Sequence, residues 1–198
     1  MPRPLRPEEP NGIFHIATRS VFEGPAFTNA ADRWDFIGTL ARVVELCDWR
    51  CKSYCLMGTH YHLVVQTPRP NLSSGMQLLN GRYAQNFNRR HGRRGHLFDS
   101  RFYSILIKTD THLLAALRYV ARNPVTAGLC QAPADWRWSS YRAVVGLDPA
   151  LRLLDVEGVL DLFSTSRDAA RAEFVRLVEG TPDAVMAVPD DLAGIGGV

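Results

Sequence analysis

Residues 49–67, WRCKSYCLMGTHYHLVVQT, decide the fold predicted for this chain. Apolar and aromatic side chains fill most of the stretch, and Gly58-Thr59 interrupts it with residues that favour a turn. The stretch therefore predicts two strands, Trp49–Met57 and Tyr61–Thr67, joined through that turn.

Five further elements are expected on either side of this pair. They are a strand over Ile13–Ser20, helices over Asp32–Asp48, Ser73–Arg89 and Thr111–Asn123, and a strand over Phe102–Lys108. Apolar residues that recur at helical spacing predict the helices, and Pro124 should terminate the last of them. The order βαββαβ followed by a helix is that of two split βαβ units. We therefore expect an α+β fold, a ferredoxin-like antiparallel sheet with its helices on one face.

The length of 198 residues fits one domain with an appendage. We expect a flexible arm at residues 1–12, the main domain at 13–147, an acidic helical extension at 148–180 and a weakly structured tail at 181–198. Apolar residues recur at helical spacing over Asp155–Glu179. Because such helices need an apolar surface to cover them, the extension should dock on the main domain.

Composition excludes several classes of protein. Hydrophobic residues make up 46% of the chain and charged residues 22%, which argues against wholesale disorder. No apolar run approaches the roughly 18 residues that span a bilayer, and the N-terminus lacks the apolar core of a signal peptide, so we expect a cytoplasmic protein. The four cysteines include no Cys-x-x-Cys pair, which indicates neither a zinc ribbon nor a disulfide framework.

Basic charge is concentrated in the first three quarters of the chain. Residues 1–150 carry 19 Lys and Arg against 11 Asp and Glu, a balance of +8, whereas residues 151–198 carry 4 against 9, a balance of −5. Between Arg82 and Arg101 there are six arginines and one acid, Asp99. An Arg-rich composition can follow from genome base content alone, but a cluster of this kind on a surface attracts polyanions.

The segment His60-Tyr61-His62 is the first candidate site. Residues two apart on a strand point to the same face, so the two imidazoles lie side by side while Tyr61 faces the opposite way. Two imidazoles on a rigid strand form half of a metal site. The alternative is that both histidines are structural.

Tyr119 and Asn123 are the second candidate. On a helical wheel Leu113, Leu117 and Val120 form one apolar stripe, whereas Tyr119 and Asn123 fall away from it. The amide oxygen of Asn123 can act as a third metal ligand beside the Tyr119 hydroxyl. The alternative is that the tyrosine packs on a neighbouring element and the amide caps the helix.

Four ordered motifs resemble those of the single-tyrosine HUH transposases. They are Tyr54–Val65, Gly95–Phe98 with Arg101–Ser104, Arg118–Gly128, and Trp138–Tyr141. Within that superfamily the chain looks most like the REP-associated tyrosine transposases, from about residue 11 to residue 145. The resemblance implies the HUH endonuclease fold for the main domain.

The resemblance also implies an activity, a metal-dependent endonuclease and strand transferase for single-stranded DNA with hairpin elements. His60, His62 and Asn123 match the metal ligands, and Tyr119 matches the nucleophile that forms a 5′-phosphotyrosine. Mg²⁺ or Mn²⁺ is the cofactor implied. Asn123 stands where some relatives have Gln. No membrane partner is expected, and the protein should be a monomer or a homodimer.

The basic segment is the expected grip on DNA phosphates. Its candidate contacts are Arg82, Arg89, Arg90, Arg93, Arg94 and Arg101. The aromatic residues interleaved with them either stack on bases or, more in keeping with their helical spacing, belong to the core; they are Tyr83, Phe87, Phe98, Phe102 and Tyr103.

Two alternative functions remain at this point. One is a domesticated protein that binds DNA hairpins without cutting them, which would need none of His60, His62, Asn123 or Tyr119. The other is a rolling-circle replication initiator or relaxase, which shares the HUH chemistry. The short chain and the motif around Tyr119 disfavour the second alternative.

Overall fold

The computed structural model describes residues 9–21, 24–98 and 102–180. Arg101, part of the expected arm and the whole of the expected tail lie outside the described residues. The elements are β1 (Gly12–Arg19), α1 (Ala30–Cys47), β2 (Arg50–Leu56), β3 (His60–Thr67), α2 (Leu72–Arg90), β4 (Tyr103–Ile107), α3 (Asp110–Thr126), the 3₁₀ turn η1 (Pro133–Asp135), α4 (Tyr141–Val144), α5 (Val156–Leu160) and α6 (Arg167–Glu179).

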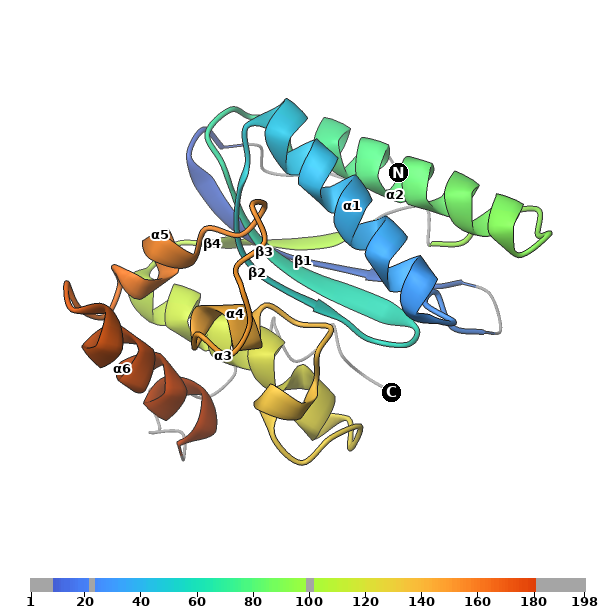
Figure 1. Cartoon of the computed structure of the whole chain (residues 1–198). Coiled ribbons are helices and arrows are strands. Elements are labelled where there is room, and N and C mark those ends of the chain that lie inside the picture. The colour runs from blue at the N-terminus through green and yellow to red at the C-terminus, as the bar shows by residue number, and fades with distance from the viewer. Residues whose placement is uncertain (1–8, 22–23, 99–101, 181–198) are drawn as a thin grey trace.

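The four strands form one antiparallel sheet in the order β2-β3-β1-β4 (Figure 1). This is the order that two split βαβ units produce, so the predicted α+β, ferredoxin-like sheet is confirmed. β2 and β3 join through the predicted turn, where the Met57 amide donates to the His60 carbonyl at 2.9 Å.

The helices of the two split βαβ units cover one face of this sheet, as expected, and the helix that follows them covers the other face. α1 and α2 pack side by side over one face, and α3 packs on β2 and β3 from the other (Figure 1). The alternation of β3 serves both layers, since Tyr61 packs on Phe36 of α1 with ring centroids 4.5 Å apart while His62 faces α3. α3, which follows β4, packs its apolar stripe against this second face of the sheet. Leu113, Leu117 and Val120 of the stripe are all buried.

The expectation that Pro124 terminates the third helix is wrong, because α3 continues to Thr126. Proline lacks a backbone N–H and so removes one helical hydrogen bond. Here it stands in the last turn, and the amides of Ala127 and Gly128 still donate to the carbonyls of Asn123 and Val125, at 3.0 and 2.9 Å. Asn123 therefore keeps its helical position.

The chain after α3 covers the outer edge of β2. The Leu56 amide donates to the Trp138 carbonyl at 2.9 Å, and the Asp155 amide donates to the Cys51 carbonyl at 2.8 Å. An exposed strand edge is a template for aggregation, and these segments occupy much of it. The acidic segment expected to be helical contains two helices, α5 and α6, separated by residues 161–166.

α6 docks on α3, as expected for the extension. Phe174 and Val178 are buried. Arg118 of α3 donates to the Leu177 carbonyl at 2.9 Å, and Arg122 donates to the Val178 carbonyl at 3.0 Å. Guanidinium groups at these last carbonyls satisfy acceptors that a helix end leaves open and complement its dipole. No helix within the described ranges is long and apolar enough to cross a membrane.

A buried carboxylate, Asp32, anchors the start of α1 to the end of α2. Its amide donates to the Asn29 side chain at 3.0 Å, and its carboxylate accepts from the Thr28 and Asn29 amides at 2.9 and 3.3 Å, which completes a capping box. Arg90 and His91 reach the same carboxylate, at 2.7 and 2.9 Å. Burial by itself raises the pKa of Asp32, but the hydrogen bonds from His91, Arg90 and the Thr28 amide outweigh it and hold the pKa below its usual value.

Asp32→Asn should lower the free energy of unfolding by about 2 kcal/mol, because the buried carboxylate binds both Arg90 and His91. The loss is smaller than for a fully buried ion pair, because the Arg90 side chain is partly exposed. Urea denaturation measures it. Asp168→Asn, in the exposed first turn of α6, is the matched control and should shift stability by less than about 0.5 kcal/mol. Equal losses in the two variants would contradict the anchoring role.

Candidate active site

β3 presents the two predicted histidines on the face that α3 covers. The His60 and His62 ring centroids are 5.1 Å apart and the rings are perpendicular. His62 is fully buried, and His60 is partly buried at the beginning of the strand. The strand alternation predicted from the sequence therefore holds, and both imidazoles occupy one surface.

A third histidine, His15 of β1, belongs to the same cluster and was missed by the sequence analysis. Its ring stacks on His62 with centroids 5.3 Å apart, and its Nε2 lies 3.2 Å from His62 Nδ1. In the β1–β3 register His15 pairs with Val64, on the face that carries His62. The sequence did contain a signal, because an imidazole is unusual within a buried strand of apolar residues. Periodicity alone, however, cannot show that His15 lies beside His62.

Each predicted ligand histidine has one nitrogen engaged and one unpaired. His60 Nδ1 lies 3.2 Å from Thr59 Oγ1, and His62 Nδ1 contacts His15. Nε2 of both rings is buried and forms no hydrogen bond of good geometry with the described residues, although the Asn123 side chain lies close to His60. Histidines that bind metals have this arrangement, because a partner on one nitrogen orients the other toward the ion. The two rings therefore fit a divalent cation.

Burial keeps these imidazoles neutral. It lowers the pKa of His15 to about 3, with a smaller contribution from the charge of His112. It lowers the pKa of His62 well below its usual value, aided by His15 and His60. The pKa of His60 is lowered too, by burial and by Arg19. Neutral rings offer lone pairs to a cation at neutral pH.

α3 brings Tyr119 and Asn123 to the histidines. The Tyr119 ring lies edge-on to His15 and His62, with centroids 5.7 and 5.4 Å away. The Asn123 side chain, one turn further along the helix, contacts both His60 and Tyr119. Burial raises the pKa of Tyr119 and the contact with Asn123 opposes it, so the phenol is protonated at neutral pH. The two candidate sites predicted separately are thus one site.

The donor set limits what can complete a metal site here. No three His, Cys, Asp or Glu side chains come together as a metal-binding group within residues 9–21, 24–98 and 102–180. A cation held by His60 and His62 would therefore draw further ligands from the Asn123 amide oxygen, from water or from a bound phosphate. Oxygen ligands of this type suit Mg²⁺ and Mn²⁺.

Arg19 is a second residue that the sequence analysis missed. It pairs directly with His60 in the β1–β3 register, so its side chain lies on the same face of the sheet. Its charge lowers the pKa of His60. A cation at this position can attract a DNA phosphate to the site.

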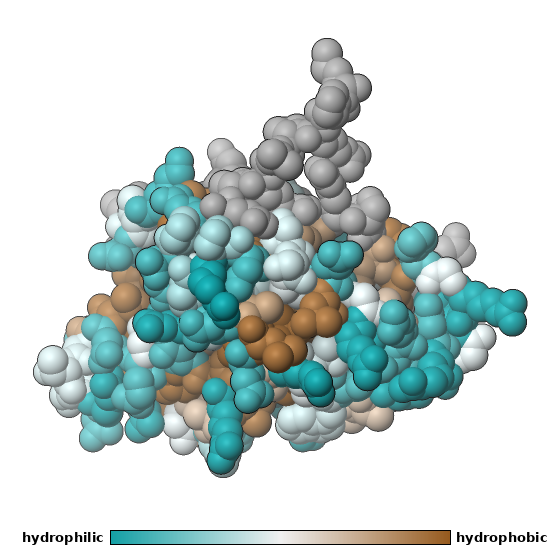
Figure 2. Space-filling view, turned by 90° about the horizontal axis from the view of Figure 1, so that it is seen from above, coloured by the Kyte–Doolittle hydropathy of each residue, from teal (hydrophilic) through white to brown (hydrophobic). Residues whose placement is uncertain are grey.

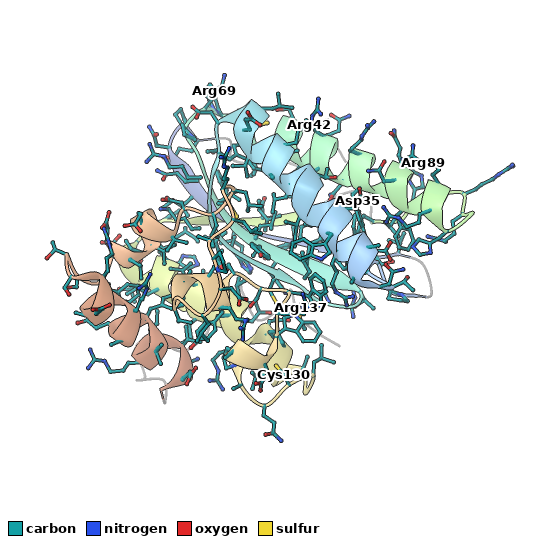
Figure 3. All side chains as sticks on the ribbon, in the orientation of Figure 1. Asp35, Arg42, Arg69, Arg89, Cys130 and Arg137 are labelled. Atoms are coloured by element: carbon teal, nitrogen blue, oxygen red, sulfur yellow. The ribbon has the colours of Figure 1, made fainter. Side chains whose placement is uncertain are left out.

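The predicted DNA-binding arginines do not join this cluster. Arg82, Arg89 and Arg90 lie on α2, across the sheet from α3, and Figure 3 labels Arg89 on that helix. The side of the molecule seen from above is largely hydrophilic around a hydrophobic patch (Figure 2). Arg90 forms ion pairs with Asp32 and Asp35, at 2.7 and 3.4 Å.

The loop after α2 contains Arg93 and Arg94 and then runs to the edge of the sheet. Phe98 in this loop forms a bridge with Ser20, and the Val21 amide donates to the Leu97 carbonyl at 3.0 Å. Ser20 follows Arg19, which lies opposite His60, so the loop meets the sheet at the end where the histidines lie.

Most of the interleaved aromatics are core residues. Tyr83, Phe87, Phe98 and Phe102 are at most 8% exposed, so they are not available to stack on bases. Tyr103 differs, because it is 47% exposed on β4 and faces the same side of the sheet as the histidines.

Three comparisons with known proteins found relatives of this chain. The family model described as "Transposase IS200 like" matches residues 10–123, which contain all three histidines, Tyr119 and Asn123. A REP-associated tyrosine transposase of Haemophilus influenzae is 29% identical over 118 residues, covering 54% of this chain and 67% of the relative.

A solved structure of a REP-associated tyrosine transposase bound to a REP hairpin is similar in fold. It superposes with a TM-score of 0.64 at 17% identity, covering 78% of this chain and 94% of the other. Because the family model spans more than half of the sequence and includes the whole His–Tyr–Asn cluster, the chain belongs to the IS200-like transposase family.

Proposed function

We propose that this protein cleaves and rejoins single-stranded DNA, with Tyr119 as the nucleophile. One observation carries the proposal: a phenol, an amide and two imidazoles, whose buried Nε2 atoms form no hydrogen bond of good geometry with the described residues, converge from α3 and β3 on one face of the sheet. Packing alone explains neither the two unpaired Nε2 atoms nor the phenol beside them. A protein that only binds DNA hairpins would need none of the four groups.

A divalent cation belongs to this proposal, held by His60 and His62 through Nε2, with Asn123 as the third ligand. When bound, such an ion supplies positive charge that neutralises phosphate oxygens and favours the phenolate form of a nearby tyrosine. That contribution matters here, because burial raises the pKa of Tyr119. Asn123 contacts the phenol as well and orients its hydroxyl.

The reaction is a transesterification at phosphorus. The Tyr119 oxygen forms a bond to the scissile phosphorus while the bond from phosphorus to the 3′ oxygen breaks. The phenol gives up one proton and the departing 3′ oxygen gains one. The 5′-phosphotyrosine retains a phosphodiester bond, so a second DNA 3′-hydroxyl can displace the tyrosine by the reverse chemistry without any nucleotide cofactor.

DNA with hairpin elements is the proposed substrate. The relative of known structure holds a REP hairpin, and residues 1–150 of this chain carry a balance of +8. Arg89, Arg93 and Arg94 at the end of α2 and in the following loop are the proposed phosphate contacts. Arg82 and Arg101 remain predictions of the same kind. Arg90 has a structural role as well, because it holds Asp32.

Tyr119→Phe should abolish the covalent protein–DNA adduct while leaving DNA binding within about twofold of wild type, because only the hydroxyl is removed. Labelled single-stranded DNA with Mn²⁺, followed by denaturing electrophoresis, detects the adduct. Tyr103→Phe removes another phenol from the same face of the sheet and should still form it. An adduct of normal yield in the Tyr119 variant would exclude this tyrosine as the nucleophile.

His15→Phe should weaken Mn²⁺ binding about 10- to 100-fold, because the ring stack on His62 survives while the nitrogen that orients it is removed. Isothermal titration of the metal into DNA-free protein measures the change. His96→Phe, on the exposed loop after α2, is the control and should bind Mn²⁺ as wild type does. Wild-type affinity in the His15 variant would mean that His62 is held in place without it.

Replacing Arg89, Arg93 and Arg94 together by Gln should flatten the salt dependence of single-strand binding. The log–log slope changes by about 0.7 for each phosphate that the protein no longer neutralises. Arg90 is left in place because its removal would disturb α1. Arg152→Gln, an exposed arginine of the acidic extension, should leave the slope unchanged. An unaltered slope in the triple variant would show that this cluster does not bind phosphate.

A further inference from the structure

We propose that Trp34, Trp138, Arg33 and Arg137 form a stacking platform for the unpaired bases of single-stranded DNA. These four residues are called the Trp–Arg platform below. The inference rests on the proposed function, because the platform would bind the same DNA strand that the site is proposed to cleave. Neither α2 nor the basic loop is part of it.

The platform is built around the ring of Trp138. The ring of Trp34, on α1, meets it edge-on with centroids 5.7 Å apart. Two guanidinium groups contact the same ring, with the Cζ atoms of Arg33 and Arg137 at 5.3 and 4.9 Å from its centroid. Aromatic rings and guanidinium groups are the side chains on which bases stack without regard to sequence.

The exposure of Trp34 distinguishes it from the tryptophans outside the platform, whereas Trp138 is partly buried, as Trp136 is. Trp34 is 50% exposed, whereas Trp49 is 4% exposed and its indole N–H donates to Asn71 at 2.8 Å. Trp136 is partly buried and its indole N–H donates to the Leu56 carbonyl at 3.1 Å. A large indole left half in water is a common feature of binding surfaces, where its apolar area stabilises a complex.

The two arginines are available to phosphate. Neither Arg33 nor Arg137 forms an ion pair within the described residues, although carboxylates are close by. Those carboxylates have other partners: Asp32 and Asp35 pair with Arg90, and Asp148 pairs with Arg142. Guanidinium groups without a carboxylate partner among the described residues complement the phosphates of a DNA backbone and disfavour a basic peptide as the ligand.

The position of the platform connects it to the active site. The Trp138 carbonyl accepts from the Leu56 amide at the end of β2, and the Phe27 amide, just before α1, donates to Gly58 in the β2–β3 turn at 3.1 Å. His60 begins β3 directly after that turn. Figure 3 shows Arg137 between α1 and the segment that follows α3. A strand whose bases stack on the platform thus leads along the turn to the histidines.

Binding of two oligonucleotides to the metal-free full chain tests the inference. One is unstructured oligothymidine, and the other has the same length and phosphates but abasic sugars. Wild type should prefer the thymidine strand, with quenching of tryptophan fluorescence. Trp34→Ala should lose about tenfold in affinity for the thymidine strand and little for the abasic one. Leu46→Ala, equally exposed at the other end of α1, should change neither affinity.

Two outcomes would overturn the platform. One is a Trp34→Ala protein with the wild-type melting temperature and an unchanged preference for bases. If that variant does not fold, Arg137→Gln replaces it, and unchanged affinity for both strands is then the contradicting result. Adduct formation at Tyr119 is measured separately with metal. A wild-type protein that prefers bases but forms no adduct would contradict the proposed function and leave the platform intact.

Discussion

The contact between the His15 and His62 imidazoles, on the face of the sheet covered by α3, is the interaction on which the site depends. It joins β1 to β3 through side chains as well as through the backbone ladder. Buried beneath Tyr119, both rings are neutral at neutral pH, because burial lowers the pKa of each. The site therefore presents nitrogen lone pairs that can bind a cation from solution.

The position of α3 is the second constraint on the site, because the proposed nucleophile Tyr119 has to stay at a fixed distance from the proposed metal ligands His60 and His62. Its apolar stripe buries against the sheet, while Arg118 and Arg122 on its outer side bind the carbonyls at the end of α6. Tyr119 and Asn123 stand next to these two arginines in the sequence. The acidic extension thus takes part in orienting the helix that carries Tyr119, the proposed nucleophile, through apolar packing and through the hydrogen bonds of Arg118 and Arg122.

Much of this could be predicted from the sequence, because the informative features were local. The turn at Gly58-Thr59 and the alternation of β3 determined which side His60 and His62 take, and the wheel of α3 separated Tyr119 and Asn123 from the apolar stripe. What escaped prediction depended on contacts between distant elements. The partner of His15, the ion pair between Arg90 and Asp32 and the placement of α3 on the far face arise only when the strands and helices are assembled.

Peptide mapping of the covalent adduct tests the central claim most directly. After reaction with a single-stranded substrate and Mn²⁺, nuclease trimming and trypsin digestion, residues 119–122 form a peptide between Arg118 and Asn123 that contains one tyrosine. The account predicts that this peptide gains the mass of a 5′-linked nucleotide, and that it does so only when metal is present. A nucleotide attached to any other peptide, or an equal yield without metal, would contradict the assignment of Tyr119 beside a His60–His62 metal site.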